Sequence, residues 1–210
     1  MSSSLSVDQA DSPALGGYAT GRATKADIVD AAFHVFNESG YVGTSVREIA
    51  RRAGINHATL LHHFPKKSDL LQAVLEHRDE LQHIDPSDLA ELFALLLGLA
   101  IRNDQHPGPV RLFTLLAAEA SEPSHPAHAY FQRRTDQLRA QIAHHIGQAQ
   151  AAGAVASDLD PTMAATQLIA LWEGLQLQAP LTNGAVVVAD YLRLAFENLL
   201  GRPVEPVFLD

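Results

Sequence analysis

The chain has 210 residues, of which 47% are hydrophobic and 19% charged, and its formal net charge is −9 at pH 7. This balance is typical of a globular protein, because enough apolar surface is available to offset the entropy lost on folding. The absence of cysteine excludes disulfides and thiol chemistry. Residues 1–17 lack the pattern of a secretory signal, and the longest apolar run, 92–101, is about half of a membrane span. We therefore expect a soluble, cytoplasmic protein without a membrane partner.

Charge is distributed unevenly along the chain and suggests three segments. Residues 1–19 are rich in Ser, Gly and Asp, which predicts a disordered tail. Residues 20–67, the head, contain seven Lys or Arg against four acidic residues, whereas residues 68–210, the body, contain eight against eighteen. A weakly basic head can dock on phosphates if the acidic body faces away from them.

The pattern of residues 24–54 predicts two helices separated by a glycine. The first has apolar residues at helical spacing and ends near Gly40, which is placed for a left-handed C-cap. Ser45 begins the second, because Ser45 and Glu48 have the spacing of a capping box, in which each side chain bonds to the other's backbone amide. The second helix ends at Gly54, a residue that tolerates the positive φ of a tight turn.

A third short helix follows the turn. Asn56 can cap it, and Leu60 and Phe64 lie four residues apart on its buried face before a proline ends it. Two short helices that are joined by a glycine turn, with a small residue such as Ala50 at their crossing, are typical of a helix-turn-helix. The sequence therefore predicts a DNA-binding motif in which residues 56–63 form the recognition helix.

The continuous stretch 28–71, IVDAAFHVFNESGYVGTSVREIARRAGINHATLLHHFPKKSDLL, resembles the TetR family of transcriptional regulators. The resemblance implies an all-α fold with an N-terminal three-helix domain, which contains the helix-turn-helix, and a larger C-terminal helical domain for ligand binding and dimerisation. It implies a repressor that a small-molecule effector releases from a pseudo-palindromic operator in double-stranded DNA. An activator of the same fold and a non-catalytic protein-interaction module are the alternatives. No enzymatic activity and no cofactor are expected.

The resemblance also assigns DNA contacts by position. Thr44 and Ser45 match residues that open the second helix and meet phosphate, and Arg47 matches a position that often reaches a base edge. Arginine can pair with two acceptors of guanine, so sequence specificity is plausible at Arg47. Asn56 is interpreted first as a cap and second as a contact. The other expected contacts are His57, Ala58 and Thr59 in the major groove, and His63 and Lys67 on phosphates.

Two positions depart from the family pattern. Leu61 stands where most members carry a Tyr that grips a phosphate, and His57 stands where many carry Lys. Both departures reduce polar or positive contact, so we expect a modest affinity that depends on the remaining contacts. Contact between Leu61 and a thymine methyl group is an alternative role.

The body is predicted to be helical throughout, with Pro and Gly at the junctions and no strand-like alternation. The expected helices are 68–83, 87–104, 109–120, 125–151, 161–178 and 185–200. The last two are apolar on more than one face, which exceeds a single core-facing stripe. We expect them to pair with their copies in a homodimer, as the resemblance implies, and two central helices of a monomer are the alternative. The stripes are Ala164, Leu168, Leu171 and Leu175 beside Met163, Ala170, Gly174 and Leu177, and Val187, Tyr191 and Leu194 beside Val188, Leu192, Ala195 and Leu199.

A ligand pocket among the middle helices is implied by the resemblance, and such pockets are mostly apolar with a few polar groups. Ordinary core positions are the alternative for every candidate, because aromatic residues at helical spacing are typical of a core. A metal site is not expected, since Pro123 interrupts the pair Glu122 and His125, and the pair Glu80 and His83 lacks the further carboxylates that a di-iron bundle requires. The candidate ligand-binding residues are Phe93, Leu97, Phe113, Ala117, His128, Phe131, Trp172 and Gln176.

Overall fold

The computed structural model describes residues 25–81 and 84–208, so the tail predicted for residues 1–19 lies outside it. The described residues form nine α-helices and one short 3-10 helix and contain no strand, which confirms the predicted all-α fold. None of these helices is long and apolar enough to cross a membrane. The helices are α1 (Lys25–Gly43), α2 (Val46–Arg52), α3 (His57–His63), α4 (Lys67–Leu81), α5 (Leu89–Gln105), α6 (Pro107–Glu119), α7 (His128–Ala151), α8 (Pro161–Gln178), η1 (Ala179–Leu181) and α9 (Val188–Leu200).

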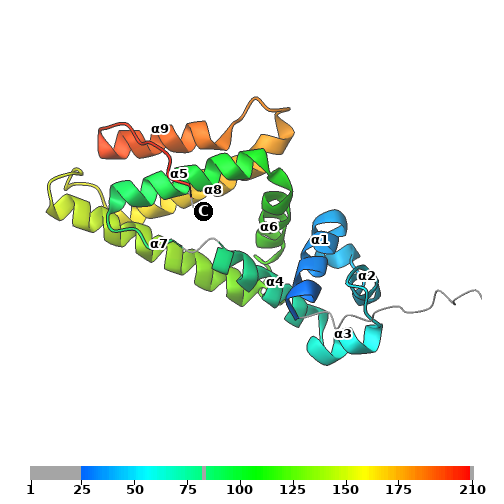
Figure 1. Cartoon of the computed structure of the whole chain (residues 1–210). Helices are drawn as coiled ribbons and strands as arrows, with labels where there is room; N and C mark the ends of the chain where they lie inside the picture. Colours follow the sequence, from blue (N-terminus) through cyan, green and yellow to red (C-terminus); the bar gives the residue numbers. More distant parts are fainter. Residues whose placement is uncertain (1–24, 82–83, 209–210) are drawn as a thin grey trace, which may run out of the picture.

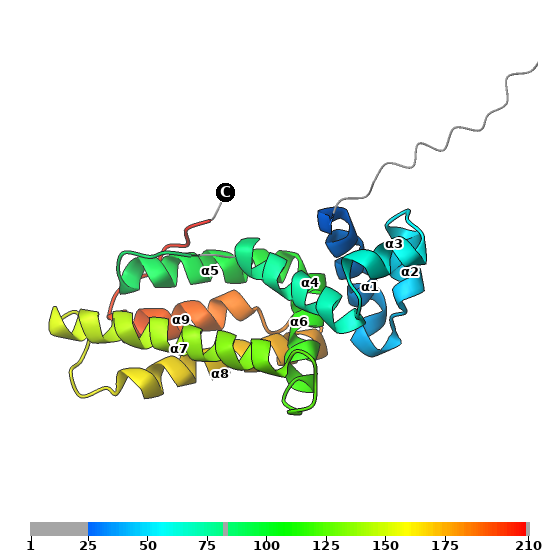
Figure 2. The ribbon, with the colours of Figure 1, turned by 90° about the horizontal axis from the view of Figure 1, so that it is seen from below.

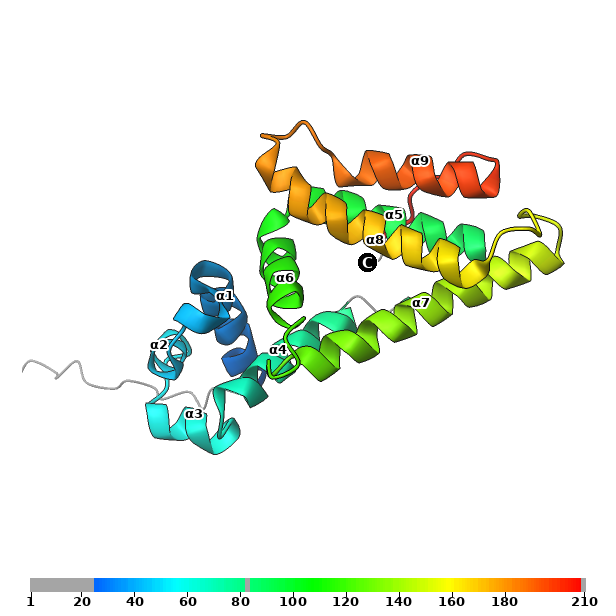
Figure 3. The same cartoon turned by 180° about the vertical axis from the view of Figure 1, so that it is seen from behind.

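The head lies at one end of an elongated body (Figure 1). Four helices, α5, α7, α8 and α9, run along the body, as the view from below shows (Figure 2). Helix α6 stands across the end of the body nearest the head, and α4 leads from the head into the body (Figure 3). Helix α1 of the head packs against both α4 and α6.

The described chain has two hydrophobic cores, and the first one spans the junction between head and body. Helices α1 to α3 contribute residues such as Phe36 and Leu60, and the first half of α4 adds Leu71 and Leu75. Helix α6 adds Leu116 to the same core. The predicted boundary between residues 67 and 68 falls at the beginning of α4, so the head shares its core with two helices of the body.

The second core lies within the body, between α5, α7, α8 and α9. At its centre the rings of Phe93 and Phe196 stack with their centroids 4.2 Å apart. The chain after α9 returns to α5, where the Val207 amide donates to the carbonyl of Ala94 at 2.9 Å. Gly98 permits this approach, because a Cβ atom there would lie 2.0 Å from the carbonyl oxygen of Val207.

Candidate DNA-binding surface and body cavity

The recognition helix α3 is held by a cap and by two buried side chains. The Oδ1 atom of Asn56 accepts a hydrogen bond from the Thr59 amide at 2.8 Å, which confirms the predicted cap. Leu60 and Phe64 are buried in the first core. Helix α3 therefore presents its other face, which includes His57 and the 36% exposed Leu61, to solvent.

The predicted capping box of α2 is formed only in part. The Ser45 hydroxyl accepts a hydrogen bond from the Glu48 amide at 3.2 Å. The Glu48 carboxylate, however, binds Arg51 at 2.9 Å and 2.5 Å instead of the Ser45 amide. The hydrogen bond from the Arg51 side chain lowers the pKa of Glu48. A nearby cation thus outcompetes the backbone amide for the carboxylate, because the bond between two charged groups is the stronger one.

The three arginines of α2 differ in their partners. Arg51 pairs with Glu48, and Arg52 pairs with Glu38 of α1. The exposed Arg47 makes no ion pair or hydrogen bond with any residue that the structure describes. The Arg47 guanidinium is therefore available to a partner outside the chain.

Two expected phosphate contacts have partners within the head. Thr44 is only 5% exposed, and its hydroxyl donates to the Gly40 carbonyl at 2.7 Å. This bond uses the one donor of the Thr44 hydroxyl within the head, and a phosphate contact at Thr44 stays a prediction. The Nζ atom of the half-buried Lys67 lies 4.4 Å from the centroid of the Tyr41 ring, and burial lowers its pKa. Ser45 and His63 are exposed, and Thr59 is half-buried.

A cavity of about 720 Å³ lies in the body, with walls from α4, α5, α6, α7 and α8. This volume falls within the range of roughly 300–1,000 Å³ that is typical of small-molecule sites. Its walls combine apolar side chains with a smaller set of polar ones. The apolar set includes Leu96, Leu99, Leu138, Ile142, Leu168 and Ile169, and the polar set includes Arg78, Asp79, Asn103, Arg134, Gln141 and Glu173.

Comparison with known proteins decides the family. The family model for bacterial regulatory proteins of the tetR family matches residues 28–74, and that for the tetracyclin repressor-like C-terminal domain matches residues 112–194. The HTH-type transcriptional repressor Rv3405c of Mycobacterium tuberculosis is 31% identical over 194 residues, covering 86% of this chain and 89% of the relative. The chain belongs to the TetR family. This TetR-family protein is a DNA-binding transcriptional regulator and not an enzyme.

Other TetR-type proteins share the sequence pattern or the fold. The HTH-type transcriptional regulator BetI of Pseudomonas aeruginosa is 27% identical over 186 residues, covering 83% of this chain and 90% of BetI. SmeT, the repressor of the Stenotrophomonas maltophilia multidrug efflux pump SmeDEF, has the same fold, with a TM-score of 0.71 at 21% identity over 89% of this chain and 98% of SmeT. A SmeT–triclosan complex gives a TM-score of 0.72 at 22% identity, covering 84% and 89% of the two chains.

Half of the candidate ligand-binding residues of this TetR-family chain line the cavity. Those four are Phe113, Ala117, Trp172 and Gln176. The other four lie elsewhere: Phe93 and Leu97 are fully buried in the second core, where Phe93 stacks on Phe196. His128 bonds through Nδ1 to a backbone carbonyl just after α6, and Phe131 packs on a neighbouring aromatic ring at 4.8 Å. Helical spacing alone did not separate the core-facing from the cavity-facing side of these helices.

The charged residues at the cavity were missed at the level of sequence. Arg78 follows Leu71, Val74 and Leu75 at intervals of three or four residues, so it lies in phase with the buried stripe of α4. A cation that continues an apolar stripe is the signal that could have identified it. Beside Arg78, Asp79 of α4 forms an ion pair at 3.2 Å with Arg134 of α7. No short-range sequence pattern predicts this contact between two distant helices.

The double stripe of α9 corresponds to an inner and an outer face, whereas Ala170, Gly174 and Leu177 in the second stripe of α8 line the body cavity. The inner stripes include Ala164 and Leu175 of α8 and Leu192 of α9, all buried in the second core. Tyr191 and Leu194 on the outer face of α9 are 44% and 58% exposed, and Met163 near the beginning of α8 is 63% exposed. Large apolar side chains gathered on two helices that pack against each other form the kind of surface that marks a protein–protein interface.

Proposed function

We propose that this regulator is a dimeric repressor that binds a pseudo-palindromic operator through α2 and α3 and leaves it when a small molecule fills the body cavity. The observation that carries the proposal is the double role of α4 and α6. On α4, Leu75 packs in the core shared with the head, and Arg78 lines the cavity one turn later. On α6, Leu116 packs in that same core and Ala117 lines the cavity.

In the proposed complex, α3 enters the major groove with His57, Ala58 and Leu61 toward the bases. Arg47 reaches a guanine edge, because it is the α2 arginine without an ion pair in the described structure. Ser45, His63 and Lys67 then meet phosphates at the margin of the groove.

Release follows from the connection between cavity and head. A ligand between α4 and α6 changes their separation, and α1 packs on both helices, so the orientation of the head changes with it. In a two-fold dimer this alters the distance between the two recognition helices, which must match half-sites about one helical turn apart. A coupling of about 1–3 kcal/mol between ligand and operator is typical of such systems and corresponds to roughly 5- to 150-fold in affinity. Repression is supported by the relative Rv3405c, which is described as a repressor.

The deciding experiment is selection of bound duplexes from a random DNA pool with the full-length protein, followed by affinity measurements on the selected site. We expect an inverted repeat. Arg47→Ala should weaken binding by roughly 5- to 150-fold, as the loss of one bidentate base contact of about 1–3 kcal/mol predicts, and should relax the preference at one base pair. Arg51→Ala is the matched control, because it removes the same charge from the same helix at a side chain that pairs with Glu48. Failure to enrich any sequence would favour a protein-interaction module instead.

The proposed dimer is tested by a charge on the outer face of α9. Leu194→Glu places a carboxylate where an apolar side chain is 58% exposed in the single chain, so folding should be unaffected and association should be lost. Sedimentation should give a dimer for the wild type and for Val207→Glu, an exposed control on the C-terminal segment, but a monomer for Leu194→Glu. A dimer that persists in the Leu194→Glu variant would place the interface elsewhere.

A further inference from the structure

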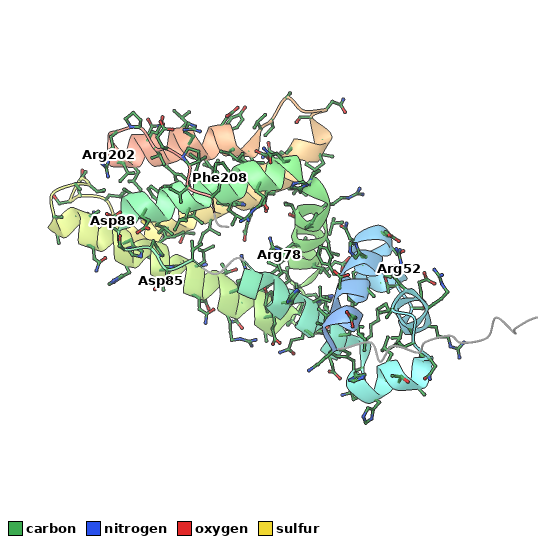
Figure 4. The ribbon with its side chains drawn as sticks, viewed as in Figure 1. Arg52, Arg78, Asp85, Asp88, Arg202 and Phe208 are labelled. Atoms are coloured by element: carbon green, nitrogen blue, oxygen red, sulfur yellow. The ribbon has the colours of Figure 1, made fainter. Side chains whose placement is uncertain are left out.

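One wall of the cavity carries a buried cation, Arg78, whose hydrogen-bonding capacity is only partly used. The Nε and Nη1 atoms of Arg78 are shielded from solvent and have no hydrogen-bond partner in the described part of the chain. Figure 4 places Arg78 on α4, at the end of the body next to the head. Burial lowers the pKa of Arg78 to about 10, so the guanidinium is still charged at neutral pH. A buried donor left unsatisfied is costly, and a buried charge more so, so a guanidinium that also lines a cavity is a strong site for an anionic acceptor.

The neighbouring groups do not neutralise Arg78. Asp79 is already occupied: one carboxylate oxygen accepts from Arg134 at 3.2 Å, and the other accepts from the Tyr130 hydroxyl at 2.6 Å. Both guanidinium groups contact the ring of Phe113, whose centroid is 3.7 Å from Cζ of Arg78 and 4.8 Å from Cζ of Arg134. Two cations therefore share one carboxylate at this end of the cavity.

The remaining acidic group of the cavity wall is on α8. Burial raises the pKa of Glu173, and the charges of Arg134 and Arg139 oppose that rise. No ion pair joins Glu173 to Arg78 in the described structure, so Arg78 has no carboxylate of its own and shares the charge of Asp79 with Arg134.

The opposite character of the other walls defines the rest of the ligand. Beyond the arginine end, α5, α7 and α8 contribute leucine and isoleucine side chains and Trp172, together with a smaller set of uncharged polar side chains, Asn103, Gln137, Gln141 and Gln176. We propose that the effector is an apolar carboxylic acid, an inference that rests on the proposed function. Its carboxylate accepts hydrogen bonds from the Arg78 guanidinium at the cavity wall, and its hydrocarbon or aromatic body lies along the apolar walls. The acid acts on α4 directly, because Arg78 lies one turn beyond the residues that anchor α4 in the core shared with the head.

Binding can be measured without DNA, because Trp172 is the single tryptophan of the chain and lines the cavity. The probes are two matched series, 4-phenylbutyrate with 4-phenylbutanol and 4-phenylbutylamine, and octanoate with octanol and octylamine. Each is titrated into the full-length protein while tryptophan fluorescence is followed. The variants are Arg78→Met, which keeps an apolar stem beside Phe113, and Arg78→Gln as a second replacement. Arg133→Met, an exposed arginine of α7 outside this cavity, is the control.

We expect the acid to bind roughly tenfold or more tightly than the alcohol in at least one series, the ratio for a hydrogen bond to a charged group. Both Arg78 variants should lose this preference while they keep the affinity for the alcohol and the far-UV circular dichroism of the wild type. Arg133→Met should retain the preference. The inference is overturned if no acid exceeds its alcohol, if the amine binds best, or if the preference survives in a folded Arg78 variant. An acid that binds through Arg78 but leaves operator affinity unchanged would contradict ligand release and not this assignment.

Discussion

Asn56 combines two roles that a set of substitutions can separate. Its side chain caps α3 through the 2.8 Å bond to the Thr59 amide, and it is exposed on the surface assigned to DNA. Asn56→Ala removes the acceptor and should cost about 0.5–2 kcal/mol of stability. Because 1 kcal/mol shifts the Tm of a domain of this size by roughly 2–4 °C, the variant should melt about 1–8 °C lower. Asn56→Ser and Asn56→Asp keep an oxygen acceptor, so their Tm should stay near that of the wild type.

Operator affinity should rank the same variants differently. Asn56→Asp keeps the cap and suits the positive end of the helix dipole, but it adds a negative charge to a surface that meets phosphates. We therefore expect Asn56→Asp to lose affinity without losing stability, whereas Asn56→Ser should resemble the wild type in both. Thermal unfolding followed by far-UV circular dichroism gives the Tm, and fluorescence anisotropy with the selected duplex gives the affinity. The reasoning is refuted if Asn56→Ser melts as low as Asn56→Ala, or if Asn56→Asp binds DNA as tightly as the wild type.

Two further substitutions test the packing of the body. Gly98→Ala should detach the C-terminal segment, since its Cβ would lie 2.0 Å from the Val207 carbonyl oxygen. The lost hydrogen bond costs about 0.5–1.5 kcal/mol, and the higher helix propensity of Ala offsets it by about 1 kcal/mol. Hydrogen exchange at the Val207 amide should therefore accelerate with little change in Tm. The control Gly147→Ala, which has open space around its Cβ, should leave that exchange unchanged. Tyr130→Phe should cost about 1.5–3 kcal/mol at neutral pH, because it removes the hydroxyl bond to Asp79. Burial, and then the bond to Asp79, raise the pKa of Tyr130 in the folded protein above 10.0. The stability difference between the wild type and Tyr130→Phe should therefore be complete below pH 10 and fall as the pH rises further. Urea unfolding on both sides of pH 10 would contradict this if that difference stayed constant.

The sequence by itself was sufficient for the features that depend on near neighbours. The Asn56 cap, the Ser45 cap and the positive φ of Gly54 all occur as predicted, because each is decided within three or four residues of the chain. The helical periods likewise predicted every α-helix of the body to within a few residues, since Pro and Gly end a helix by their own geometry. The assignment of Arg47 to DNA came instead from the resemblance to the TetR family, and it stays a prediction.

The tertiary structure alone decided which of the marked side chains are available to a partner. Arg52 is occupied because α1 brings Glu38 to it, and Arg78 is left unpaired because α7 directs Arg134 and Tyr130 onto Asp79. These outcomes depend on distances between helices that are far apart in the sequence, and a helical period gives the direction of a side chain without naming the group that it meets. The same reason explains why Phe93 stacks in a core while Phe113 lines a cavity, although both are aromatic residues on apolar helix faces.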